Sequence, residues 1–117
     1  MYIITLMILL KRQNYLFLNK GNKMEHLTED TFQEKTNNGK VLLQFTAEWC
    51  GPCKKLSPLV EELTINKFKV DVDDCTNLSK KFSIRSVPTL VLLENGVEVK
   101  RFTGLMKKND LDSFVNG

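Results

Sequence analysis

Apolar residues occur along the chain in short runs that are separated by turn-forming residues. Runs of about four to eight apolar or alternating positions predict β-strands. On this basis we expect strands at residues 24–27, 41–46, 68–72, 89–93 and 97–102. Asn95 and Gly96 lie between the last two runs, and this pair is typical of a tight hairpin, so these two strands are expected to be antiparallel.

Between these runs the apolar positions recur at helical spacing. We expect helices at residues 29–35, 76–82 and 107–115, and a further helix that starts near Cys50. Thr28 is expected to be the N-cap of the first helix, with Glu29 in its first turn. The last helix is expected to bury Leu111, Phe114 and Val115.

The helix near Cys50 has two prolines. Pro52 suits its first turn, whereas Pro58 removes a backbone donor from its interior, so we expect a kink there. Its buried face is expected to consist of Leu56, Leu59, Val60 and Leu63. The order of elements, β-α-β-α-β-α-β-β-α, predicts an α/β fold with a central mixed β-sheet and helices on both faces.

Length and composition are those of one globular domain. The chain has 117 residues, of which 42% are hydrophobic and 26% charged, which is enough to bury a core without disulfides or metals. Although the net charge is +3, four basic residues and no acidic ones precede Met24, so residues 24–117 carry 13 basic and 14 acidic residues. This balance gives no reason to expect nucleic-acid binding.

Residues 1–23 are expected to be a leader of uncertain structure that precedes a domain at residues 24–117. Residues 1–10 are apolar but too few to span a bilayer. The charges follow this apolar run and no small-residue cleavage site appears, unlike in a secretory signal. We favour a disordered or loosely packed leader over a peripheral anchor or targeting sequence, and expect no firm membrane association.

Two of the three cysteines, Cys50 and Cys53, are three positions apart at the expected start of a helix. Their side chains should therefore share one face, at a Cα separation within the window of about 4.4–6.8 Å that a disulfide needs. The helix N-terminus favours thiolate over thiol, most of all at Cys50, which we expect to be the outer, exposed nucleophile. Cys53 is expected to point inward and to resolve the mixed disulfide.

Two other uses of this cysteine pair are less well supported. A structural zinc site needs four ligands, and the spare candidates, Cys75 and His26, have no supporting spacing. A permanent disulfide across two intervening residues would stabilise the fold little. We therefore favour redox cycling, with no metal and no bound cofactor. The small, odd number of cysteines argues against a secreted disulfide framework, and we expect a cytoplasmic protein.

The segment Trp49-Cys50-Gly51-Pro52-Cys53-Lys54 resembles the active-site segment of the thioredoxin family at every position. Further segments resemble the family in the same order: they are Val70–Asp73, Val87–Thr89, Asn95–Gly96 and Thr103–Gly104. The resemblance covers roughly residues 24–117. It implies the thioredoxin fold and a reversible Cys50–Cys53 dithiol/disulfide.

The resemblance also implies a substrate-binding surface around the cysteines. Trp49, Gly51 and Pro52 would form an apolar rim beside the sulfur. Val87 would precede a cis peptide bond and offer its backbone to an extended substrate segment, while Pro88 would pack against the disulfide. Gly104 would allow close backbone approach on the third side of the groove. Without the resemblance, Pro88 would be interpreted as part of an ordinary trans turn.

The chain departs from the family in a strand beneath these cysteines. Gln44 stands where thioredoxins usually carry a buried aspartate that is thought to take the proton of the second cysteine. A neutral amide cannot accept that proton, so we expect slower resolution with water as the acceptor, and a more stable fold. Lys69 matches a lysine that lies near that aspartate in the family; here we expect it to have lost its partner and to be a solvated strand-edge residue.

Two further departures concern length and the third cysteine. Cys53 and Asp71 are only 18 positions apart, so the intervening helix and loop are shorter than in typical members, which puts recognition by a standard thioredoxin reductase in doubt. Cys75 corresponds to an accessory thiol of animal thioredoxins. We expect a half-buried structural residue, with Asp73 and Asp74 raising its pKa.

These features predict a protein-disulfide reductase that acts on disulfide-containing proteins and is reduced by a thioredoxin reductase or an equivalent donor. We expect a monomer. A disulfide oxidase or isomerase is the alternative within the enzyme class, but Gly51-Pro52 resembles reductases, whereas oxidases and isomerases more often carry histidine there. A non-catalytic binding or processivity subunit is the alternative from another class.

Overall fold

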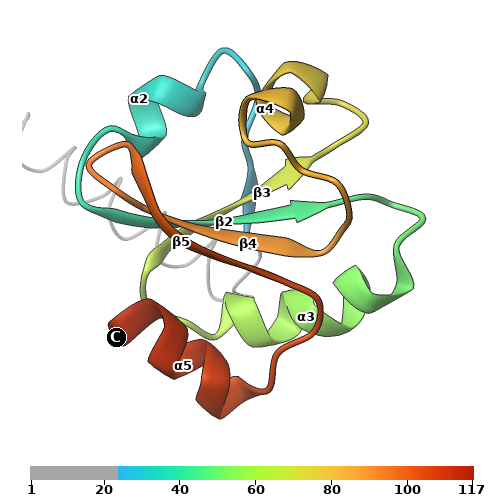
Figure 1. Ribbon diagram of the computed structural model, residues 1–117, viewed down its shortest axis with the longest axis vertical. Coiled ribbons are helices and arrows are strands. Elements are labelled where there is room, and N and C mark those ends of the chain that lie inside the picture. Colours follow the sequence, from blue (N-terminus) through green and yellow to red (C-terminus); the bar gives the residue numbers. More distant parts are fainter. Residues whose placement is uncertain (1–23) are drawn as a thin grey trace, which may run out of the picture.

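The computed structural model describes residues 24–117, so the leader expected at residues 1–23 lies outside the described residues. The elements follow the predicted order (Figure 1). They are β1 (Glu25–His26), α2 (Phe32–Thr36), β2 (Lys40–Thr46), α3 (Gly51–Glu61), β3 (Asn66–Asp71), α4 (Thr76–Lys81), β4 (Thr89–Glu94), β5 (Val97–Thr103) and α5 (Lys108–Asn116).

The five strands form one mixed sheet in the order β1-β3-β2-β4-β5. β3 pairs in parallel with both β1 and β2, whereas β4 is antiparallel to β2 and to β5. Helices α2 and α4 cover one face of the sheet, and α3 and α5 cover the other (Figure 1). The expectation of a central mixed sheet between two helical layers is therefore confirmed.

The central strand β2 is covered on both faces, as its apolar sequence predicts. Its side chains alternate between two cores because successive residues of a strand point to opposite faces. Val41, Leu43 and Phe45 pack toward α2 and α4, whereas Leu42 packs with residues of α3 and α5. Gln44 shares the α3 face with Leu42 and is completely buried. The one polar residue of this strand's centre therefore lies under α3.

The first helix starts later than predicted. Thr28 is not its N-cap; the cap is Thr31, and the helix begins at Phe32. The hydroxyl groups of Thr28 and Thr31 lie 3.0 Å apart and hydrogen-bond within the preceding turn, an alternative that threonine side chains offer to helical backbone. Glu29, expected in the first turn, instead accepts hydrogen bonds from the backbone N–H groups of Asn77 and Leu78 at the start of α4.

The other predicted elements agree with the structure to within two residues at either end. Helix α3 continues through Pro58 to Glu61, so the kink there stays a prediction. Two residues expected in the core are only half-buried: they are Leu59 and Phe114. Phe114 lies near the surface, where the ammonium group of Lys100 is 5.2 Å from the centre of its ring.

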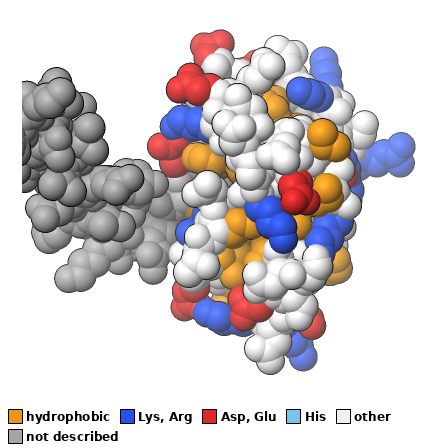
Figure 2. Space-filling view, turned by 90° about the vertical axis from the view of Figure 1, so that its left-hand side faces the viewer, with side chains coloured by type: hydrophobic (Ala, Val, Ile, Leu, Met, Phe, Trp, Pro, Cys, Tyr) orange, Lys and Arg blue, Asp and Glu red, His pale blue; other side chains and the backbone are white. Residues whose placement is uncertain are grey.

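The surface mixes both signs of charge. Figure 2 shows small groups of hydrophobic side chains among lysine, arginine, aspartate and glutamate side chains on one side of the molecule. The large hydrophobic residues that are most exposed are Trp49, Val97, Val99, Phe102 and Leu105. Of the helices in residues 24–117, none combines the length and the apolar character of a membrane span.

Candidate functional site

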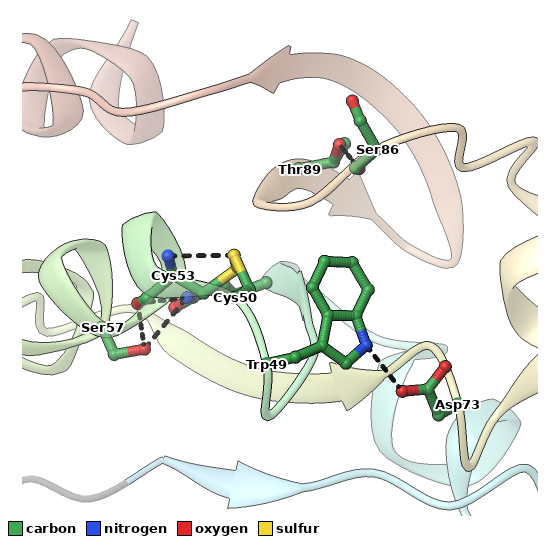
Figure 3. Close-up of a disulfide and its surroundings, with 8 residues drawn as sticks. Trp49, Cys50, Cys53, Ser57, Asp73, Ser86 and Thr89 are labelled. Atoms are coloured by element: carbon green, nitrogen blue, oxygen red, sulfur yellow. Dashed lines mark hydrogen bonds between the residues drawn. A yellow bond between two sulfur atoms is a disulfide. The ribbon is translucent and has the colours of Figure 1, made fainter.

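Cys50 and Cys53 form a disulfide at the start of α3 (Figure 3). Their Cα atoms are 5.3 Å apart, within the range expected from their spacing. Cys50 is the N-cap of the helix, in an extended conformation, and its Sγ accepts a hydrogen bond of 3.1 Å from the backbone N–H of Cys53. One of the free N–H donors at the helix N-terminus therefore points at the sulfur of Cys50.

Cys50 and Cys53 are both buried in this disulfide form. Cys50 is 3% exposed and Cys53 is 1% exposed, so the expectation that Cys50 is exposed is wrong for this state. The reason is that Ala47, Val72 and Val87 pack around the disulfide. The rim beside it is open, since Trp49 is 71% exposed.

The turn that precedes β4 lies against the disulfide. The peptide bond between Val87 and Pro88 is cis, and Val87 packs against the two cysteines. Pro88 is buried, and its carbonyl accepts a hydrogen bond of 2.9 Å from the backbone N–H of Gly104. Gly104 has a φ of +114°, a conformation that strongly favours glycine. Three of the residues expected to bind substrate are therefore held together, and Val87 among them lies beside the cysteines.

A small groove of about 120 Å³ extends from this turn to the tryptophan. Its walls are Trp49, Val72, Ile84, Arg85, Ser86 and Val87. The backbone around it is fixed by the hydroxyl of Thr89, which donates a hydrogen bond of 2.8 Å to the carbonyl of Ser86 (Figure 3). Ile84, Arg85 and Ser86 were not predicted as site residues, although their position directly before Val87 was a signal that pointed to them.

Trp49 is held in place by an aspartate from a distant segment. Its Nε1–H donates a hydrogen bond of 3.0 Å to Oδ2 of Asp73, which follows β3 (Figure 3). The indole is therefore both exposed and oriented. This contact was not predicted, because Asp73 lies 24 positions from Trp49 and no local pattern links the two residues.

Gln44 lies beneath Cys53, as expected from the sequence. Its Nε2 donates hydrogen bonds to Oγ of Ser57, at 3.0 Å, and to the carbonyl of Cys53, at 3.5 Å. Ser57 donates to the same carbonyl at 2.9 Å. Within residues 24–117, Oε1 of Gln44 finds no hydrogen-bond partner. Ser57 was not predicted; its spacing of four from Cys53 on a helix was the available signal.

Lys69 has a partner, contrary to expectation. It is paired with Gln44 in the register of β2 and β3, and its Nζ lies 3.9 Å from Oε1 of Glu61. Both side chains are only partly exposed, at 21% for Lys69 and 19% for Glu61. Because Lys69 points toward α3, it faces the last turn of that helix instead of solvent.

Cys75 is a free thiol and is buried, not half-buried, at the N-cap of α4. Its Sγ lies 3.4 Å from the carbonyl oxygen of Leu27. Burial raises the pKa of this thiol, and the negative charges of Glu29, Asp74 and Asp71 raise it further. The prediction that the pKa of Cys75 is raised is confirmed, with burial as the main cause. Of the two carboxylates that were expected to contribute, Asp74 does so, whereas Glu29 and Asp71 contribute in place of Asp73.

The described part of the chain brings no three His, Cys, Asp or Glu side chains close enough to share a metal ion. The paired sulfurs at the helix N-terminus can, by contrast, exchange electrons as dithiol and disulfide. The chemistry that this geometry supports is therefore thiol–disulfide exchange.

Comparisons with known proteins agree with this chemistry. The family model for thioredoxin matches residues 23–117. Thioredoxin from Chlamydia trachomatis serovar D is 37% identical over 95 residues, which covers 77% of this chain and 93% of the relative. Thioredoxin from Mycoplasmoides gallisepticum is 38% identical over 99 residues, covering 79% of this chain and 99% of the relative.

Solved structures show the same fold. A mutant thioredoxin from Halobacterium salinarum NRC-1 matches with a TM-score of 0.75 and 32% identity, over 81% of this chain and 89% of that one. Thioredoxin from Malassezia sympodialis matches with a TM-score of 0.71 and 26% identity, over 80% and 88% of the two chains. This chain therefore belongs to the thioredoxin family and is a thiol–disulfide oxidoreductase.

Proposed function

We propose that the protein reduces disulfide bonds of other proteins, with Cys50 as the nucleophile and Cys53 as the resolving thiol. The observation that carries this proposal is the hydrogen bond from the N–H of Cys53 to Sγ of Cys50 at the N-terminus of α3. In the reduced protein the same donor and the helix dipole stabilise a thiolate at Cys50. Only the thiolate is nucleophilic enough to attack a disulfide.

The reaction has two exchange steps. The Cys50 thiolate attacks one sulfur of the substrate disulfide, and the other substrate sulfur leaves as a thiolate. Cys53 then loses its proton and attacks Sγ of Cys50, which releases the first substrate sulfur and forms the Cys50–Cys53 disulfide. With Cα atoms 5.3 Å apart, this bond closes without a large backbone movement. Two electrons pass from the protein to the substrate.

The surface beside the disulfide suits an extended segment of a substrate protein. Trp49, Gly51 and Pro52 offer an exposed apolar rim, and the groove of about 120 Å³ has room for one small side chain next to the cysteines. The cis turn at Val87 and Pro88 would present backbone groups to the substrate, with Gly104 on the third side. Such a surface recognises backbone more than sequence, which favours a general reductase over one with a narrow target.

The oxidised protein has to be reduced again by an external dithiol. We propose a thioredoxin reductase or an equivalent electron donor, acting on a monomer in the cytoplasm. The electron donor has to reach the same disulfide as the substrate does. We therefore expect the donor to bind the exposed rim around Trp49 as well.

Reduction of insulin by dithiothreitol, followed as turbidity, tests the proposal. The wild-type protein should accelerate precipitation, whereas a variant with Cys50→Ser and Cys53→Ser should not. Cys75→Ser is the matched control and should behave as the wild type does, because Cys75 belongs to the core cluster under α2 and α4 and not to the cluster that contains the disulfide. A wild-type protein without effect, or a double variant as active as the wild type, would contradict the reductase function.

A further inference from the structure

A pocket of about 370 Å³ lies between α3 and the strands β1, β2 and β3. Cys53, Ser57 and Glu61 all line it from the helix side. Residues four apart on a helix are neighbours on one face, so these three form a single stripe that runs from the disulfide to the last turn of α3. Charged and hydroxyl side chains line part of its wall, and it is large enough for several water molecules.

The reaction described above leaves one proton without an acceptor. Cys53 is 1% exposed, and its thiol has to lose a proton before it can attack the mixed disulfide. Gln44 is the polar side chain closest beneath it in the sheet, but an amide is neutral, and its Nε2 already donates to Ser57 and to the carbonyl of Cys53. The proton has to leave on the pocket side instead.

Several side chains of the pocket could be considered as its acceptor. The titratable or charged groups that line it are His26, Glu48, Lys54, Glu61, Lys69 and Asp71. The lysines are donors and cannot accept a further proton. Asp71 accepts the backbone N–H groups of Asp73 and Asp74 at 2.8 and 3.2 Å, so its carboxylate is engaged in a turn. His26 and Glu48 are exposed and lie outside the stripe of α3.

The remaining group is the carboxylate of Glu61, which is only 19% exposed and is held by Lys69 at 3.9 Å. We propose that Glu61 accepts the proton of Cys53 through water in this pocket, an inference that rests on the proposed reductase function. Ser57 positions that water. Its hydroxyl donates to the carbonyl of Cys53 and accepts from Gln44, which leaves one lone pair of the oxygen for a water molecule.

Protons and electrons balance in this step. In the mixed disulfide, the Sγ–H of Cys53 gives its proton to pocket water, which passes a proton to the carboxylate of Glu61. The Cys53 thiolate forms a bond to Sγ of Cys50, and the bond from Cys50 to the substrate sulfur breaks. The substrate leaves as a thiolate that takes a proton from solvent. Glu61 returns its proton to solvent through the open side of the pocket, so the carboxylate is restored.

The test uses Glu61→Gln, with Glu62→Gln as a matched control. Glu62 is the next residue of the chain, but it is exposed, lies outside this pocket and pairs with Lys108. Each reduced protein is mixed with one equivalent of dithiobis(nitrobenzoate). Attack by Cys50 releases a first thionitrobenzoate, and attack by Cys53 on the mixed disulfide releases a second, so absorbance gives both rates in one experiment. Urea midpoints check that the variants are folded.

At neutral pH, Glu61→Gln should slow the second release by at least about tenfold, less than the roughly 10²–10⁴-fold of direct general base catalysis because water intervenes. The first release should be unchanged. The difference in the rate of the second release between Glu61→Gln and the wild type should shrink as the pH rises above about 8.5, where a thiol ionises without a base. Glu62→Gln should match the wild type in both phases.

Two results would overturn the role of Glu61: a second release as fast as in the wild type at neutral pH, or a deficit of the same size at every pH, which would indicate a structural effect. Failure of the reductase function itself looks different, because the wild-type protein would then not accelerate insulin reduction at all.

Discussion

Gln44 donates a hydrogen bond of 3.0 Å to Ser57 directly beneath the second cysteine of the disulfide. A neutral amide and a hydroxyl therefore occupy the buried position under Cys53, and neither group takes up a proton at neutral pH. Hydrogen bonds between the two side chains offset part of the cost of burying them, whereas Oε1 of Gln44 has no donor among the described residues. We expect this arrangement to favour stability over proton transfer, because an amide, unlike a carboxylate, has no charge to bury.

Replacing Gln44 with aspartate should restore a buried base under Cys53 and lower the stability of the fold. Burial raises the pKa of a carboxyl group at this position, so Gln44→Asp should act as a base near neutral pH and speed the second exchange step. The carboxyl group at position 44 would then hold its proton more tightly in the folded state than in the unfolded chain. The variant should therefore lose stability as the pH rises from about 4 through the raised pKa, reaching a deficit of about 1–3 kcal/mol at neutral pH.

Stopped-flow rates and urea midpoints at several pH values measure these two effects. Ser57→Ala serves as a control that disturbs the same hydrogen bonds without adding a titrating group, so its stability should not fall further with pH. The interpretation of Gln44 fails if Gln44→Asp is neither faster at neutral pH nor less stable there.

The hydrogen bond from Trp49 to Asp73 should matter for substrate binding more than for stability. Asp73→Ala removes the acceptor that orients an indole with 71% exposure. We expect kcat/KM for insulin to fall about two- to tenfold, as the net loss of one hydrogen bond implies. The unfolding free energy should change by less than about 0.5 kcal/mol, as is usual for surface substitutions.

Asp74→Ala is the matched control for this variant, because Asp74 is the next residue, is also exposed, and does not accept the indole hydrogen bond. Tryptophan fluorescence reports on Trp49 alone, since the chain has one tryptophan. Equal kcat/KM values for the two variants would mean that Asp73 has no part in presenting the rim.

Cys75 should make stability depend on pH in the alkaline range. Burial and three nearby carboxylates raise its pKa above the ordinary value of 9.0, so the unfolded chain loses this proton more readily than the folded protein. The contribution of the protonated Cys75 thiol to the free energy of unfolding is complete below pH 9. It is lost as the pH rises toward the raised pKa, by up to about 1.4 kcal/mol per pH unit.

Urea unfolding of the oxidised wild type and of Cys75→Ala between pH 8 and pH 10 measures this contribution, since both keep the Cys50–Cys53 disulfide. The difference in unfolding free energy between the two proteins should shrink as the pH rises. A difference that stays constant or grows would show that the thiol of Cys75 ionises at least as easily in the folded protein as in the unfolded chain.

Much of the architecture was predictable because its signals are local. The apolar run of β2 predicted a central strand, Asn95-Gly96 predicted the β4–β5 hairpin, and the position of Cys50 before Pro52 predicted a helix N-terminus at the disulfide. Each of these depends on neighbours in sequence, and each is confirmed. The start of α2 was wrong for a local reason too, since the side chains of Thr28 and Thr31 compete with the helix for backbone groups.

The contacts that complete the site were not predictable in the same way. Glu61 meets Lys69 across the loop between α3 and β3, and Trp49, which precedes α3, meets Asp73, which follows β3. Both contacts depend on how α3 packs on the sheet, which no local sequence signal gives. The burial of Cys50 likewise depends on Val72 and Val87 from other segments. A sequence pattern indicates which residues carry the chemistry, whereas their partners follow from the packing of α3 on the sheet.

The central claim, that Cys50 is activated by the N-terminus of α3, is tested most directly by the pH dependence of alkylation. The reduced protein is treated with iodoacetamide at a series of pH values, and the modification of Cys50 is quantified by mass spectrometry of its peptide. The midpoint of the rate should lie clearly below that of free cysteine, which ionises near about pH 8.5. A midpoint equal to or above that of free cysteine would contradict the account.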